Sequence, residues 1–469
     1  MARSPKPPKK PGETIVPEIY AHRIVRTLHL RIDDQPGRLG AVASAVGKAG
    51  GLIGDVTRDW VDTAHVYRRI TVYVQDERHL EKVLSDIRAV GGVDVLEVVD
   101  DVLRIHEGGK IEISSRLHLS SMEDLQKVYT PGVASVSKKI QADPSLARKY
   151  TWVANTAAIV TNGTAILGLG DIGPLAGLPV MEGKSLILKE LAGVNCVPIL
   201  VEARDAATII STVERIYKGF GAIMLEDIAA PTCFEVEDEL DRRLPVPVFH
   251  DDQHGTAIVV LAGLINALKR VGKSAAGVSV VVNGAGAAGT AIAKMLVHYG
   301  VGDVVVLDTH GAIYPGRREN NPPKEQLAKL TNRSRIRGGL DELIPGRDVF
   351  VGVSKPGVLS KTSAAKMKER SVIFALANPE PEITITDALE AGAAVATDGR
   401  TMNNALAFPG IMRGTLDSGA PKITPKMKLA AAHAIAESAE APALLPNLLD
   451  PAVHARVAAA VAKAAASGG

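Results

Sequence analysis

Apolar and polar side chains alternate over three stretches of the first hundred residues, 24–32, 70–74 and 93–99. Such alternation predicts strands that bury one face. Residues 39–46 and 80–87 instead carry their apolar side chains at helical spacing, which predicts two amphipathic helices. With a fourth strand before residue 70 that no alternation marks, we predict the order βαββαβ of a ferredoxin-like domain.

Further along the chain the apolar runs become continuous, as in strands that are buried on both faces. They occupy residues 278–282, 303–308, 348–353 and 371–377, with helix-length segments between the first two. This succession predicts a Rossmann-type, doubly wound α/β domain. We therefore divide the chain into a disordered basic tail (1–21), a ferredoxin-like domain (22–100), an α/β domain (101–252), a Rossmann domain (253–420) and C-terminal helices (421–469).

Composition narrows the class of protein. Hydrophobic residues make up 46% and charged residues 23% of the chain, as in ordinary globular proteins. A net charge of +2 and only 3% aromatic residues do not favour a nucleic-acid partner. We recognise neither a membrane-spanning run nor a secretory signal. Cys196 and Cys233 lie in apolar surroundings and are expected to stay reduced, so we expect a cytoplasmic protein.

Two acidic pairs each follow a short apolar run. Glu226–Asp227 comes after AIML, and Asp251–Asp252 comes after PVPVF. Carboxyl ends of strands are where ligands bind in open α/β sheets, and converging carboxylates favour a hard cation such as Mg²⁺ or Mn²⁺. The alternative is a solvated acidic loop, which is what we expect for the acids between the pairs: Glu235, Glu237, Asp238 and Glu239.

A lysine and a tyrosine before the acidic pairs are candidates for proton transfer. Lys184 begins an apolar, helix-like run, where burial beside a cation would lower its pKa and let it act as a base. Lys189 on the same run is expected to be solvated. Tyr129 ends a helix that Pro131 stops, and it is either a core filler or a proton donor.

Two glycine-rich stretches differ in their context. Asn162–Gly163 predicts a hairpin turn, and the following GLGDIG at residues 168–173 shows no helix-length run directly after it. The second stretch follows the apolar strand at 278–282 and precedes a helix, which is the context of a dinucleotide-binding loop. This loop comprises Gly284, Ala285, Gly286, Ala287, Ala288 and Gly289.

The next strand ends at Asp308, where a carboxylate would accept hydrogen bonds from the ribose hydroxyls of NAD. Asp308 would also repel the 2′-phosphate of NADP, which favours NAD. Arg317 and Arg318 follow downstream and would reverse that preference if they reached the same place, so NADP stays open.

The sequence DQPGRL at residues 34–39, with the helix after it and GGLI, resembles the ACT domain over roughly residues 22–100. ACT domains commonly pair with one another and bind amino acids or related small molecules. The resemblance implies a regulatory module with Asp34, Gly37 and Leu39 near its ligand. A pairing module that has lost its ligand is the alternative.

A series of motifs resembles the malic enzymes of the shorter bacterial type, over roughly residues 110–420. In chain order they are YTPGVA, TNGTAILGLGDIGP, PVMEGK, LEDIAAPTCF, VFHDDQHGTA, ALANPEPEI and MNNALAFPG. The resemblance implies oxidative decarboxylation of malate to pyruvate and CO₂, with a nicotinamide cofactor and Mg²⁺ or Mn²⁺. It also implies an assembly of at least two chains.

The resemblance assigns roles position by position. The implied residues are the metal ligands Glu226, Asp227 and Asp252, the base Lys184 with Asp251 beside it, the proton donor Tyr129, and the substrate-binding Asn378 with Asn403 or Asn404. Ala165 stands where the larger eukaryotic enzymes carry an arginine that contacts the substrate carboxylate.

Three other functions remain open. A malolactic enzyme shares these motifs but keeps NAD bound and releases lactate. A catalytically silent sensor, or an amino-acid dehydrogenase with an ACT-like front end, would require no metal-dependent turnover of malate.

Overall fold

The computed structural model describes residues 23–166 and 168–467. The chain forms two compact units, which divide between Glu112 and Ile113. The first unit contains β1 (Ile24–Asp33), α1 (Arg38–Ala49), β2 (Leu52–Val61), β3 (His65–Val74), α2 (Glu77–Arg88), β4 (Val93–Asp100) and α3 (Asp101–His106).

The strands of this unit form an antiparallel sheet in the order β2-β3-β1-β4. Its core joins inward-facing strand residues such as Leu28 and Ile70 to Val46 of α1 and Ile87 of α2. The predicted order βαββαβ is present. Most of β2 is exposed, which explains why no apolar alternation marks this strand in the sequence.

The second unit begins with three short helices, α4 (Met122–Val128), α5 (Val133–Ala142) and α6 (Ala147–Tyr150), none of which buries a residue. A parallel sheet with the order β6-β5-β7-β8 follows. Its elements are β5 (Thr156–Thr161), α7 (Pro174–Ala192), β6 (Asn195–Leu200), α8 (Ala206–Ile216), β7 (Ala222–Leu225), α9 (Thr232–Arg243) and β8 (Val248–His250).

Two local predictions in this sheet are wrong. Asn162–Gly163 is not a hairpin turn, because β5 and β6 are parallel and α7 connects them. A helix does follow GLGDIG directly, since α7 begins at Pro174, and Lys184 therefore lies in its middle. Pro179 inside α7 disguises the helix in the sequence, because proline usually interrupts helices.

The Rossmann-type sheet has the order β11-β10-β9-β12-β13-β14, parallel apart from β11 at its edge. Its elements are β9 (Ser279–Asn283), α11 (Ala287–Tyr299), β10 (Asp303–Asp308), β11 (Gly311–Ala312), α12 (Pro322–Leu330), α13 (Leu340–Leu343), β12 (Val349–Gly352), α14 (Lys361–Ala364), β13 (Val372–Ala375), α15 (Ile385–Glu390) and β14 (Val395–Asp398).

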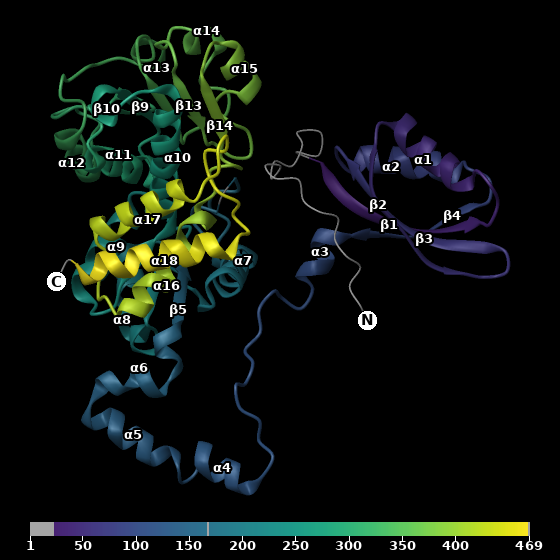
Figure 1. The fold of residues 1–469 in the computed structure, drawn as a ribbon, viewed down its shortest axis with the longest axis horizontal. Coiled ribbons are helices and arrows are strands. Elements are labelled where there is room, and N and C mark those ends of the chain that lie inside the picture. Colours follow the sequence, from purple (N-terminus) through teal and green to yellow (C-terminus); the bar gives the residue numbers. More distant parts are fainter. Residues whose placement is uncertain (1–22, 167, 468–469) are drawn as a thin grey trace. The chain divides into compact units, whose positions relative to one another are not determined.

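The helix α10 (Thr256–Val271) connects the two sheets and packs in a core cluster that contains residues of both. Together with the turn before it, the stretch Asp251–Val271 is long and apolar enough to cross a membrane by length and composition alone. Its burial in the core accounts for that composition. The C-terminal helices α16 (Phe408–Ser418), α17 (Pro425–Glu437) and α18 (Pro451–Ala466) pack together, and α18 also contacts α7 (Figure 1).

Candidate active site

The two acidic pairs meet at the carboxyl edge of the parallel sheet β6-β5-β7-β8. Glu226 and Asp227 directly follow β7, and Asp251 and Asp252 directly follow β8, its parallel neighbour. One carboxylate oxygen from each of Glu226, Asp227 and Asp252 lies within 4.8 Å of the others. The backbone N–H of Asp227 donates to the Asp252 carboxylate over 2.8 Å, which ties the two strand ends together.

These carboxylates are crowded and mostly removed from water. Glu226 and Asp227 are each 2% exposed, and Glu226 Oε2 and Asp227 Oδ2 are buried without a hydrogen-bond partner among the described residues. Burial and the charge of Asp252 raise the pKa of Glu226 well above its usual range and that of Asp227 to about 8. Buried carboxylate oxygens that lack hydrogen-bond partners fit a hard divalent cation. The cation would bind these oxygens and offset the repulsion between the three negatively charged acids.

Lys184 lies beside this cluster, with its side chain 12% exposed. Its Nζ atom is 3.0 Å from Glu226 Oε1, donates to the Asp251 carboxylate and lies 4.8 Å from the centre of the Phe408 ring. Burial lowers the pKa of Lys184, but Asp251 and Glu226 raise it more, so the amine of the metal-free protein is held as a cation. The ring of Phe408 is a neighbour that sequence reasoning missed.

The four residues assigned by the resemblance outside this cluster are spread over the second unit. Asn404 begins a short 3₁₀ turn that packs against the turn Asp251–Gly255, and Asn378 follows β13 at the carboxyl edge of the Rossmann-type sheet. Asn403 is exposed and caps that turn by accepting from Ala405 N–H. Tyr129 is 65% exposed, and no described contact joins it to Lys184 or to the acids.

The predicted dinucleotide loop lies between β9 and α11, as its glycine spacing requires. Gly284 has a φ of +124°, and a Cβ on Gly289 would lie 1.8 Å from the Gly284 carbonyl oxygen, so side chains are excluded at both positions. A cavity of about 580 Å³ opens here. Its lining includes Asn283, Gly284, Ala285, Gly286, Asp308, Lys324 and Ser354.

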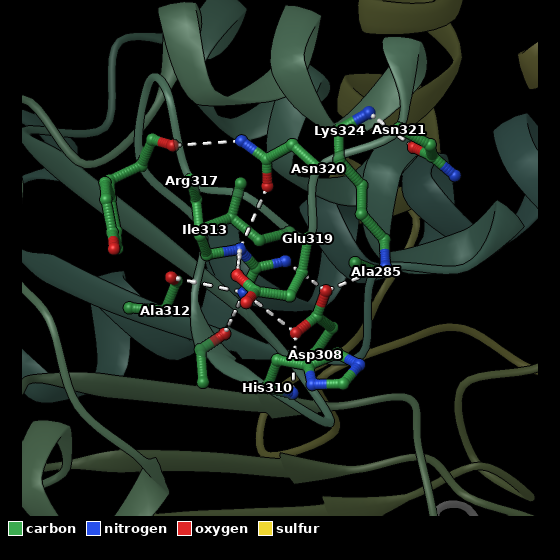
Figure 2. Close-up of polar contacts among 12 residues, drawn as sticks. Ala285, Asp308, His310, Ala312, Ile313, Arg317, Glu319, Asn320, Asn321 and Lys324 are labelled. Carbon is green, nitrogen blue, oxygen red and sulfur yellow. Dashed lines mark hydrogen bonds and ion pairs between the residues drawn. The ribbon is translucent and has the colours of Figure 1, made fainter.

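Asp308 differs from the free carboxylate that we predicted (Figure 2). Both of its oxygens accept from the guanidinium of Arg317, and Oδ2 also accepts from Lys324 Nζ over 2.7 Å. Oδ1 accepts from His310 N–H over 2.8 Å. Burial raises the pKa of Asp308, but Arg317 and Lys324 lower it more, to below its usual range. Two cations therefore neutralise this carboxylate, while Arg318 is exposed.

The residues predicted near a regulatory ligand lie in the turn between β1 and α1. Asp34 and Gly37 are exposed, and Gly37 has a left-handed φ of +86° that glycine adopts without strain. Leu39 is half-buried and packs against the core of the first unit. Their part in ligand binding stays a prediction.

The comparisons with known proteins match the parts of the chain that form the two parallel sheets of the second unit. The N-terminal domain of malic enzymes matches residues 108–241, and their NAD-binding domain matches residues 253–466. NAD-dependent malic enzyme 1 of Bacillus subtilis is 44% identical over 448 residues, which are 95% of this chain and 99% of that protein. The bifunctional malic/malolactic enzyme of the same organism is 48% identical over 379 residues, which are 78% of this chain and 92% of that protein. The crystal structure of NAD-dependent malic enzyme from Thermotoga maritima matches with a TM-score of 0.75 at 43% identity, over 77% of this chain and 99% of that one.

Proposed function

Because the chain belongs to the malic enzyme family, we propose that it converts (S)-malate to pyruvate and CO₂ while reducing NAD or NADP. The observation that carries this proposal is the contact of Lys184 with Asp251 and Glu226, next to the three converging carboxylates. The turn that bears Asp251 and Asp252 packs against α11, the helix that follows the dinucleotide loop. Substrate and nicotinamide would therefore meet at this turn.

In the proposed reaction Glu226, Asp227 and Asp252 would hold a Mg²⁺ or Mn²⁺ ion, which would supply Lewis-acid polarisation of the substrate. Lys184 would accept the C2 hydroxyl proton, and a bound nicotinamide would supply the acceptor for the C2 hydride. Asp251 holds the lysine amine in position. After CO₂ leaves, Tyr129 returns a proton to C3. The positive charge of a bound cation would offset the negative charge of these carboxylates and so lower the pKa of Lys184.

The test of this function is an assay of malate with NAD or NADP, with and without Mn²⁺. We expect stoichiometric NADH or NADPH and pyruvate, both abolished by EDTA. Lactate formed without released NADH would instead support the malolactic alternative, which one relative's name includes. Absence of any metal-dependent turnover would contradict the proposal.

The cofactor preference offers a more specific prediction. Lys324 and Arg317 neutralise Asp308 at the strand end where the adenosine ribose binds in Rossmann domains. Replacing Lys324 by methionine removes one of these cations, and we expect kcat/KM for NADP to fall more than that for NAD, by a further factor of about 10. Steady-state kinetics with both cofactors measures this ratio. Lys329→Met on the same helix, α12, is the control, and equal losses for both cofactors would contradict the role of Lys324.

We also propose that the chain acts as a dimer. The segment before β5 carries large apolar side chains that are exposed on one chain, among them Ile113, Leu117, Met122 and Tyr129. A second copy is the partner that would cover them, and it would also receive Tyr129 at its own site. The expected mass in solution is therefore twice 49.3 kDa or a multiple of that, measured by light scattering.

A mixing experiment tests the sharing of Tyr129. Tyr129→Phe and Lys184→Met should each be nearly inactive alone, because each removes a proton-transfer group. In random mixed dimers half of the molecules carry one intact site, so about a quarter of the wild-type turnover should return. No recovery in proven mixed dimers would contradict the shared site.

The first unit is proposed to be an ACT-type regulatory module that binds an amino acid or a related effector near Asp34, Gly37 and Leu39. The support is its βαββαβ order together with the DQPGRL turn. Screening amino acids and acyl-CoA compounds for a change in malate KM tests this role. We also propose a cytoplasmic location, which the free, buried thiols of Cys196 and Cys233 support.

A further inference from the structure

Glu237 is a buried acid that the reaction does not use. The sequence places it in a run of acids that we predicted to be solvated, and that prediction is wrong for Glu237, which is only 8% exposed. It lies on α9, where Cys233, Val236 and Leu240 are also buried. These residues have the spacing of one helix face, which packs toward β8 and includes Glu237.

The partners of Glu237 surround the pair Asp251–Asp252. His250 N–H, immediately before the pair, donates to Glu237 Oε1 over 3.1 Å. Gln253 Nε2, immediately after the pair, donates to Oε2 over 2.9 Å, and His254 Nε2 lies 2.9 Å from Oε1. One carboxylate therefore contacts three of the five residues 250–254, and only the two acids are left out.

The turn that Glu237 holds is an unusual one. Residues Asp251–Gly255 form a π-helical turn before α10 continues as an ordinary helix. π-Helical turns are rare and are frequently found at functional sites. A Cβ on Gly255 would lie 1.9 Å from Asp251 Oδ1, so the turn is also closely packed. Contacts from outside are needed to favour it over an α-helical continuation, which would rotate the acids around the helix axis.

Glu237 is held as an ionised acceptor. Burial raises its pKa, but His254 and the ammonium group of Lys428 on α17 lower it more, to about 2. An ionised carboxylate accepts with both oxygens and has no proton to donate. A glutamine has the same size, but one of its two terminal groups is an amide NH₂, which cannot accept a hydrogen bond. It could therefore accept only from the donors that face its remaining oxygen.

We propose that Glu237 is a positioning residue for the metal site, because its contacts with His250, Gln253 and His254 hold the turn that directs Asp251 to Lys184 and Asp252 to Glu226 and Asp227. Glu237 contacts none of the proposed metal ligands through its own carboxylate. Its effect is on their orientation. This inference rests on the proposed function only in taking those three acids as the metal ligands.

Direct titration of the full chain with Mn²⁺, followed by the electron paramagnetic resonance of free Mn²⁺ and without substrate, tests the inference. Glu237→Gln should bind Mn²⁺ about 10- to 100-fold more weakly than the wild type, as much as the loss of a ligand's direct hydrogen-bond partner, because the turn orients Asp252. Glu239→Gln on the same helix pairs only with surface arginines and should bind normally. NADH binding, measured by fluorescence, should be unchanged in both.

A second variant covers the case in which Glu237→Gln fails to fold. Gln253→Met keeps the side-chain size, removes one donor to Glu237 and should weaken Mn²⁺ binding by a smaller factor of about 3 to 10. Wild-type Mn²⁺ affinity in a folded Glu237→Gln, or in Gln253→Met if the first variant does not fold, would overturn the positioning role. A wild-type chain that binds no Mn²⁺ would overturn the metal assignment as well, which distinguishes the two failures.

Discussion

Replacing Lys184 by methionine is expected to lower kcat for malate oxidation by about 10²- to 10⁴-fold, the range that a general base contributes. A methionine side chain is similar in length to lysine and would occupy the same space beside Phe408. It has no amine to accept the C2 hydroxyl proton. The metal ligands and the dinucleotide loop stay intact. Mn²⁺ and NADH binding should therefore persist, so that the loss appears in kcat and not in either affinity.

Lys189 supplies the matched control for this experiment. It lies on the same helix, α7, is exposed, and donates to Asn195 over 2.8 Å. Lys189→Met should retain wild-type kcat. Near-normal turnover of Lys184→Met, with Mn²⁺ bound, would show that another group removes the proton.

Much of the fold could be predicted because buried parallel strands leave a direct pattern in the sequence. Continuous apolar runs locate β9, β10, β12 and β13, and the glycine spacing between β9 and α11 locates the loop. The acidic pairs were visible for a related reason, since each directly follows a buried strand. Strand β2 left no pattern, because its side chains are mostly exposed and packing does not constrain them.

The remaining parts of the site depend on contacts between distant residues. Asp308 looked like a free acid, but Arg317 and Lys324 return to it from a loop and a helix farther along the chain. Tyr129 was assigned by resemblance, yet no described contact within one chain brings it to the site. Glu237 was different, because the buried face of α9 was readable from its spacing once that segment was taken as a helix instead of a loop.

Replacing Asp227 by asparagine is expected to reverse the effect of Mn²⁺ on stability. Without metal, the folded protein holds the Asp227 pKa at about 8, above the usual 3.8, so the native state binds this proton more tightly than the unfolded state. Stability that is present below pH 4 is therefore lost as the pH rises toward 8. Asparagine carries no charge to bury, so in EDTA at pH 8 the variant should melt at a higher temperature than the wild type.

With Mn²⁺ the order should invert. A concentration 100 times its Kd stabilises the wild type by about 2.7 kcal/mol, while a variant that has lost a ligand gains little at the same concentration. Turnover of Asp227→Asn should fall by about 10²- to 10³-fold, because polarisation by the metal supplies several kcal/mol of the catalysis. Asp241→Asn, at a half-exposed acid on α9, is the control for both measurements. Thermal melts at pH 5 and pH 8, each with EDTA and with Mn²⁺, test these expectations. A variant that melts below the wild type in EDTA at pH 8 would show that the Asp227 carboxylate is stabilising without a cation, contrary to the crowding of acids at this site.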